Sequence, residues 1–119
     1  MTGREPFVAV TKVDPGICGF PCIIKAQKED ARTVSIEISG SGCKQIQELS
    51  EDLQKMSFME LFKPISHNPV MISAQSAGCH TSCPIPVAIL KTVEAAMKMA
   101  LPKDVKIEVS IDENCPKII

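Results

Sequence analysis

Tryptophan and tyrosine are absent from this sequence of 119 residues, and phenylalanine occurs only four times. The chain therefore has few side chains that stack on bases, sugars or quaternary ammonium groups. A strong charge of either sign is also missing, because 13 Lys and Arg residues stand against 14 Asp and Glu residues. This balance removes the electrostatic argument for binding nucleic acid or an anionic membrane surface, and we expect neither partner.

Long hydrophobic runs are missing too. The apolar run Phe7–Val10 stops at Thr11 and Lys12, whereas a signal peptide needs about 7–15 apolar residues. No uncharged stretch approaches the roughly 18 residues of a membrane span. We therefore expect a cytoplasmic chain with reduced thiols. Because 45% of its residues are apolar, we also expect one core and a single domain over residues 1–119.

Residues 34–39 and 105–112 alternate apolar and polar residues, the pattern of a strand with one buried face. With two further apolar segments they make four predicted strands. They are residues 7–13, 22–26, 34–39 and 105–112. The sequence Asp14-Pro15-Gly16 separates the first two, and it favours a turn because Pro presets φ and Gly accepts positive φ. Residues 7–39 thus predict a three-stranded antiparallel meander, and residues 105–112 predict the clearest further strand.

Two segments space their apolar residues as on one face of a helix, namely residues 46–56 and 85–101. Ser41-Gly42 precedes the first. Pro84 and Pro86 suit the first turn of the second, where a missing N–H group costs nothing, and Pro102 ends it. Residues 57–82 show no steady period: Ser57–Phe62 indicates a helical turn and Val70–Ala74 a short strand or extended piece.

These elements predict the α+β class. We expect a two-layer sandwich with a mainly antiparallel sheet of about four strands and two helices on one face, in the order β-β-β-α-α-β. The strand directions bring all six cysteines to one end of the sheet if residues 57–82 return the chain to that end before the second helix.

Six cysteines are the most informative residues of the chain. They make up about 5% of it, below the roughly 8–10% of a disulfide scaffold, and reduced thiols in this number point to metal or redox chemistry. Both C-x3-C pairs, Cys18 with Cys22 and Cys79 with Cys83, lie in loops that can turn two sulfurs toward one metal.

The preferred metal ligands adjoin a glycine or a helix start, where backbone N–H groups can hydrogen-bond a thiolate. They are Cys18, Cys43, Cys79 and Cys83. Less favoured are Cys22, which enters a strand, Cys115, which is near the C-terminus, and His80. Four thiolates suit either a zinc ion or an iron–sulfur cluster, and the sequence does not distinguish the two.

Cys43 and Cys83 each precede a predicted helix, whose unpaired N–H groups are expected to lower the pKa of a thiol. The sequence from Cys83-Pro84-Ile85-Pro86 through the helix and the strand at 105–112 resembles the CPxP segment of TusA-like sulfur carriers. This resemblance covers residues 83–112 and implies that Cys83 carries a persulfide. The family normally has glycine three residues before that cysteine, whereas this chain has His80.

The chain as a whole, with Pro-Gly-Ile-Cys-Gly-Phe and Ser-Gly-Cys, resembles a small uncharacterised cysteine-containing family of anaerobic microbes, which implies no activity. Three hypotheses stay open: a metal or iron–sulfur binding module, a persulfide or thiol carrier acting through Cys83, and a structural or partner-binding domain with inert buried cysteines. In the last case the partner is another protein or a second copy. An enzyme is less favoured, because no P-loop, G-x-G-x-x-G or nucleophile elbow is present.

Overall fold

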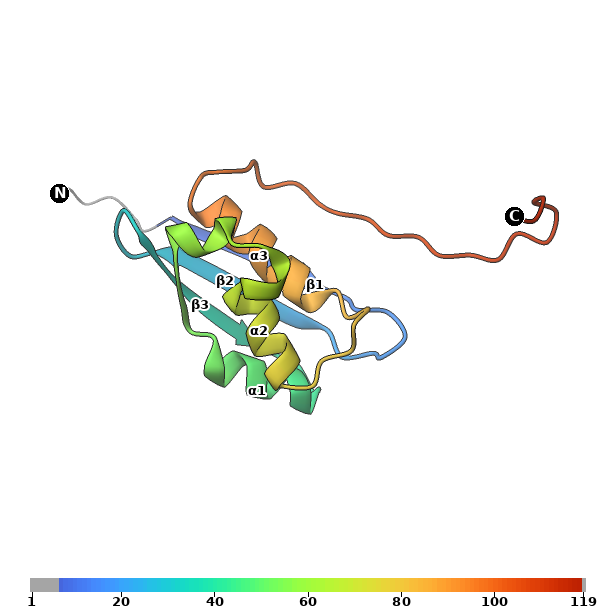
Figure 1. The fold of residues 1–119 in the computed structure, drawn as a ribbon, viewed down its shortest axis with the longest axis horizontal. Coiled ribbons are helices and arrows are strands. Elements are labelled where there is room, and N and C mark those ends of the chain that lie inside the picture. Colours follow the sequence, from blue (N-terminus) through green and yellow to red (C-terminus); the bar gives the residue numbers. More distant parts are fainter. Residues whose placement is uncertain (1–6, 119) are drawn as a thin grey trace.

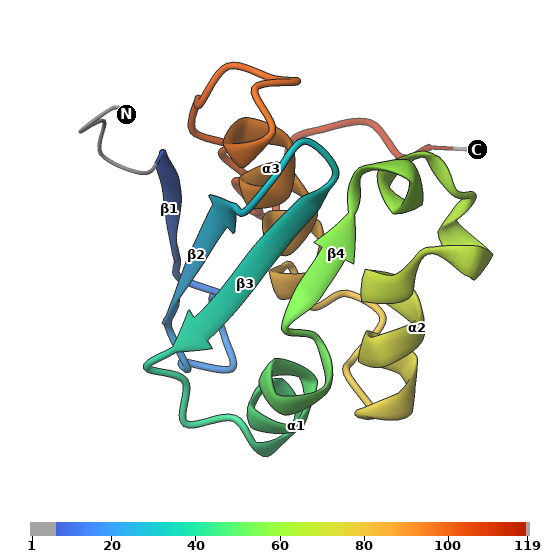
Figure 2. The same cartoon turned by 90° about the vertical axis from the view of Figure 1, so that its left-hand side faces the viewer.

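Four antiparallel strands form a meander in chain order. The computed structural model describes residues 7–118. Its strands are β1 (Val8–Val13), β2 (Cys22–Lys28), β3 (Thr33–Ser39) and β4 (Lys55–Ser57). Each strand pairs with the next one along the chain, so the sheet order is β1-β2-β3-β4 (Figure 2). The predicted meander over residues 7–39 is confirmed.

One face of the sheet forms the core, because the apolar positions of neighbouring strands fall in the same rows. Ala26 stands between Ala9 and Ile36, and the next row is formed by Thr11, Ile24 and Ile38. The core-facing residues of β2 are at most 3% exposed. The other face is exposed to solvent. On β1 and β2 it carries Val8, Val10 and Ile23, which are 37–53% exposed, among polar residues.

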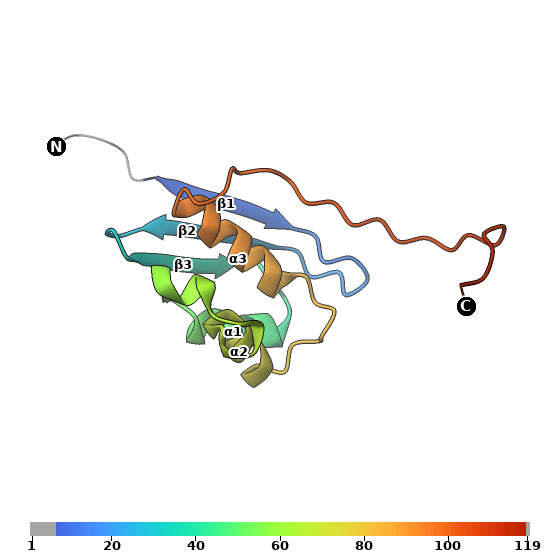
Figure 3. The same cartoon turned by 45° about the horizontal axis from the view of Figure 1, so that its top comes forward.

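All three helices cover that core face, as Figures 2 and 3 show. They are α1 (Lys44–Asp52), α2 (Pro69–Ser76) and α3 (Ile85–Ala96). Two short 3-10 turns, η1 (Phe58–Phe62) and η2 (Ile65–His67), lie between β4 and α2. The predicted α+β class, with an antiparallel four-stranded sheet, is confirmed, and the helical turn expected at 57–62 is η1. No helix in residues 7–118 has the length and apolar character needed to cross a membrane.

Helix α3 holds the centre of the core. Ile85, Ile89 and Val93 recur every four residues and are at most 1% exposed. On the same helix the hydroxyl of Thr92 lies 2.6 Å from that of Thr11 on β1 and donates to the carbonyl of Ala88 at 2.6 Å. These bonds satisfy a buried polar side chain and fix α3 against β1.

The segment expected to be a strand or extended piece at Val70–Ala74 lies within helix α2 instead. The side chain of Asn68 caps this helix by accepting the N–H of Val70 at 3.0 Å, and Pro69 occupies the first turn. Asn68 is itself 4% exposed, and its amide donates to the carbonyl of Glu60 at 3.2 Å. This cap starts a helix that has too weak an apolar period to be read from sequence.

The first helix ends earlier than the predicted range 46–56. Leu53 leaves helical geometry at φ −109° and ψ 86°, and Met56 then pairs with Val34 as part of β4. Both side chains are at most 1% exposed. Met56 was assigned to the apolar face of the helix, but it fills the core from the fourth strand.

The prediction of a strand at 105–112 is wrong for the single chain, because these residues pair with no strand of the sheet. Helix α3 ends at Ala96, and Lys98 takes φ 61°, a left-handed conformation that stops a helix before the predicted end at 101. Residues 101–112 then run as an extended arm with no strand pairing, clear of the sheet (Figure 1). The sheet's fourth strand is β4, and the arm stands outside the two layers.

Candidate functional site

Five of the six cysteines lie in the connections at one end of the sheet, where β1 ends and β2 begins. This end, the hairpin end, also holds the link from β3 to α1 and the link from α2 to α3 (Figures 1 and 3). Residues 57–82 therefore bring the chain back to the hairpin end before α3 begins. This is the condition under which the strand directions predicted that the cysteines share one end. Every cysteine is a free thiol.

The loop between β1 and β2 carries an exposed and a buried thiol. The N–H of Gly19 donates to the carbonyl of Gly16 at 2.9 Å, and both glycines have positive φ, as the predicted turn requires. Cys18 lies exposed within this turn. Cys22 begins β2 on the core face, and burial, aided by the nearby Cys83, raises its pKa to about 11.

Cys43 caps helix α1 with its backbone. Its own N–H donates to the hydroxyl of Ser41 at 3.1 Å, and its thiol donates to the side-chain oxygen of Gln45 at 3.2 Å. Gly42 lies directly against the ring of Phe20, where a Cβ would come within 2.9 Å. This close packing ties the β1–β2 loop to the start of α1 and so holds two cysteine-bearing segments side by side.

Cys79 is placed by the way α2 ends. Gly78 takes φ 75°, its N–H donates to Gln75, and the N–H of Cys79 donates to the carbonyl of Ala74 at 2.9 Å. These two bonds form a Schellman motif, a common helix ending that needs a left-handed residue at the position of Gly78. The position of Cys79 is thus fixed by backbone hydrogen bonds.

Cys83 stands just before the proline-rich start of α3. Its N–H donates to the carbonyl of His80 at 3.0 Å, which closes the turn between the two cysteines. The expectation that the helix start lowers its pKa is wrong. Burial raises the pKa of Cys83 first, the backbone N–H of Ile85 opposes this by bonding the thiolate, and Cys18 and Cys43 raise it further.

We call Cys18, Cys22, Cys43, Cys79 and Cys83 the thiol cluster. Burial raises the pKa of Cys79, and its neighbours Cys83, Cys43 and Glu48 raise it further. Mutual shifts of this kind act over short distances, because exposed charges are screened beyond roughly 10 Å. For the three thiols with raised pKa values, the nearby charges are all negative. The thiols of Cys22, Cys79 and Cys83 therefore resist ionisation.

Within residues 7–118 no three His, Cys, Asp or Glu side chains are already arranged to hold a metal ion. Cys115 follows the extended arm in the sequence and is exposed, and it is not among the groups that shift the pKa values of the clustered thiols. His80 is exposed, and it contributes its carbonyl to the turn rather than its ring. The structure thus gathers the four preferred cysteines together with Cys22 and leaves Cys115 outside.

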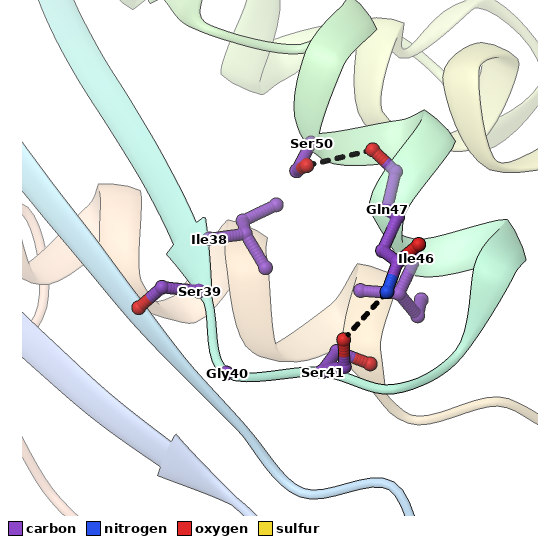
Figure 4. Close-up of a pocket in the computed structure, with 7 residues that line it drawn as sticks. All are labelled: Ile38, Ser39, Gly40, Ser41, Ile46, Gln47 and Ser50. Atoms are coloured by element: carbon purple, nitrogen blue, oxygen red, sulfur yellow. Dashed lines mark hydrogen bonds between the residues drawn. The ribbon is translucent and has the colours of Figure 1, made fainter.

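A hollow of about 70 Å³ beside the start of α1 offers no alternative site (Figure 4). Its polar groups bond one another: the amide of Gln47 donates to the carbonyl of Ser41 at 3.0 Å, and Ser50 donates to the carbonyl of Gln47 at 2.7 Å. Its lining has no thiol and no ionisable side chain.

Sequence reasoning missed three neighbours of the cluster. They are Phe20, Gln45 and Glu48. Gln45 lies two residues after Cys43, so the bond between them is local. Glu48 acts on Cys79, which belongs to another segment, so no sequence spacing indicates that contact. Phe20 had no such signal either, because its contact with Gly42 joins two loops that are far apart in the sequence.

The fold and the cluster define a small α+β domain with reduced thiols gathered at one end of its sheet. Residues 9–109 match the family described as "Family of unknown function (DUF6951)". Because this match covers most of the sequence, the chain belongs to that family. No curated protein and no solved structure shows significant similarity to the chain.

Proposed function

We propose that the protein binds a metal ion or an iron–sulfur cluster through the thiolates of Cys18, Cys43, Cys79 and Cys83, in a reducing compartment such as the cytoplasm. Zinc and iron–sulfur clusters both take four thiolates. The observation that carries the proposal is the convergence of these four thiols, with Cys22 beside them, from separate connections at the hairpin end.

Charge gives the first support. Burial and neighbouring thiols raise the pKa values of Cys79 and Cys83, and the carboxylate of Glu48 adds to the effect at Cys79. A cation bound among these groups would lower the pKa values of the thiols, because a coordinating thiol gives up its proton. The cluster therefore has the electrostatic character of a cation site, and its affinity should rise with pH.

The backbone gives the second support. Cys79 follows a hydrogen-bonded helix ending, Cys83 ends a closed turn, and Cys43 caps α1. Among the four proposed ligands only Cys18 is exposed, and the other three are partly buried. Metal sites are rarely complete before the ion arrives. We therefore expect Cys43, Cys79 and Cys83 to receive the metal first and the turn that carries Cys18 to close over it.

The test begins with anaerobic purification from cells supplied with iron and zinc. We expect about one zinc per chain by elemental analysis, or iron with sulfide and a broad absorption near 400 nm. The absence of Trp and Tyr leaves the spectrum below that band clear. Cys83→Ser should remove most of the metal, because it takes away a thiolate held by the turn before α3.

Cys115→Ser is the matched control, since it removes an exposed thiol outside the cluster, and it should retain the full metal content. Cys83→Ser must also show the far-UV circular dichroism of the parent chain, so that metal loss is not the result of unfolding. Folded parent protein without metal, or equal metal loss in both variants, would contradict the proposal.

A second candidate function rests on the N–H of Ile85, which bonds the thiolate of Cys83 at the start of α3. A carrier would use this thiolate to attack the outer sulfur of a donor persulfide, forming a new S–S bond at Cys83 and releasing the donor thiolate. Mass spectrometry of fresh, metal-free protein would then find one added sulfur on Cys83. Metal binding with no added sulfur would exclude the carrier.

A further inference from the structure

The extended arm at residues 101–112 has the composition of a strand but no strand beside it. Val105, Ile107, Val109 and Ile111 share one face and are 58–90% exposed. On the opposite face Lys106 lies 3.7 Å from Glu108, so the arm already has the two-residue period of a strand. An exposed row of four β-branched side chains is unusual in a monomer and marks a surface that binds.

The sheet has an unpaired edge at β1, where a further strand could be added. Among the described residues β1 pairs with β2 alone, which leaves its outer edge open. The core-facing residues Ala9, Thr11 and Val13 remain partly exposed. Their partners on β2, in contrast, are at most 3% exposed. The core is therefore incompletely covered along β1, and one more strand on that side would bury these residues.

We propose that residues 105–111 of one chain pair with the open edge of β1 in a second copy, so that two chains exchange their arms. The apolar face of the arm then covers the incomplete core beside α3. Its polar face, with Lys106 and Glu108, continues the open face of the sheet. Strand addition of this kind satisfies the free backbone groups of both partners.

The path of the chain gives the direction of pairing. The ammonium group of Lys98 lies 5.1 Å from the centre of the Phe7 ring, so the arm departs from the place where β1 begins. Figures 1 and 3 show it running from there toward the hairpin end, in the direction of β1. In an exchange of identical segments, each arm takes in the partner the place that it would take beside its own β1. We therefore expect parallel pairing, with Cys115 of the second copy at the end that holds Cys18.

Two observations favour a second copy over the chain's own β1. The arm stands clear of the sheet and gives the molecule a length of 60 Å against 29 and 28 Å in the other directions. Pro102 lies at its root, where it favours extended backbone. An arm held open in this way is the arrangement from which identical chains exchange strands. The family match reaches residue 109, so the arm belongs to the domain that the family shares.

The experiment uses the full chain, reduced and kept free of metal with a chelator, in sedimentation analysis over a range of concentrations. We expect a dimer, with slow hydrogen exchange at residues 105–111 and at β1 that is lost on dilution. Ile107→Asp should raise the dimer dissociation constant at least about tenfold, because it places a charge in the covered row. Glu108→Gln, on the polar face, should leave that constant unchanged.

Ile107→Asp should also keep the circular dichroism of the parent chain, since the side chain of Ile107 is 75% exposed in the single chain. A parent chain that stays monomeric at every concentration would overturn the proposal. A monomer with slow exchange at residues 105–111 would overturn it too, because the arm would then cover its own β1. A dimer that tolerates Ile107→Asp would place the interface elsewhere.

The direction of pairing has its own readout. Diamide takes two electrons and two protons from a pair of thiols, and in the parallel dimer it should join Cys18 of one chain to Cys115 of the other. The product is a covalent dimer that Cys115→Ser abolishes. A dimer in solution that gives no such link would overturn the parallel direction. Because all these measurements are made without metal, their outcome is independent of metal binding.

Discussion

The buried thiol of Cys22 should make stability depend on pH in the alkaline range. Its pKa rises from 9.0 in the free side chain to about 11 in the folded chain. Between these values the unfolded chain releases a proton that the folded chain keeps. The stabilisation is therefore complete below pH 9 and is lost as the pH rises toward 11.

The expected size follows from this shift. Each pKa unit corresponds to about 1.4 kcal/mol, so at pH 10.5 the thiol of Cys22 alone should lower the free energy of unfolding by about 2 kcal/mol. Cys22→Ala removes this proton. At pH 8 the substitution should cost about 1–3 kcal/mol through lost packing, and at pH 10.5 that cost should fall by about 2 kcal/mol.

The assay is urea unfolding at both pH values, followed by far-UV circular dichroism with a reductant and a chelator present. Fluorescence is of little use, because the chain has no Trp or Tyr. Cys115→Ala is the matched control: its thiol is exposed, so its effect should stay within about 0.5 kcal/mol at both pH values. If Cys22→Ala costs the same at pH 8 and pH 10.5, the thiol ionises equally in both states and the reasoning fails.

Two further substitutions test how α2 is built. Asn68→Ala removes the cap on the N–H of Val70 and should lower the free energy of unfolding by about 1–2 kcal/mol, whereas the exposed Asn114→Ala should have little effect in the same urea titration. Gly78→Ala forces a side chain into the left-handed conformation at φ 75° and should cost about 1–2 kcal/mol; a thermal midpoint equal to that of the parent chain would show that the Schellman ending can be replaced.

The meander could be predicted because each of its strands is buried on one face, which forces a period of two. Ile24 and Ile38 face each other across β2 and β3, and the polar residues between such positions face solvent. The convergence of five of the six cysteines was predictable for the same reason, since strand directions decide which connections share an end. Cys115 was placed with them through a strand at 105–112 that does not form in the chain. The prediction depended on one condition, that residues 57–82 bring the chain back to the hairpin end before α3, and they do.

Three features could not be predicted from apolar and polar patterns in the sequence. Helix α2 depends on the cap at Asn68 more than on an apolar period. The alternation at 105–112 shows that a segment suits a sheet, but it does not say whether an edge of the same chain receives it. The pKa of Cys83 depends on burial and on Cys18 and Cys43, and these contacts exist only in the folded chain.

The order of the sheet has a consequence for how the protein folds. Every strand pairs with its neighbour in the sequence, and β1, β2 and β3 are joined by short loops, so we expect these three strands to form early. The contact between Thr11 and Thr92 joins residues 81 positions apart, and its large loop-closure cost places the docking of α3 late. We therefore expect Cys18 and Cys22 to meet Cys83 only when α3 docks on the sheet.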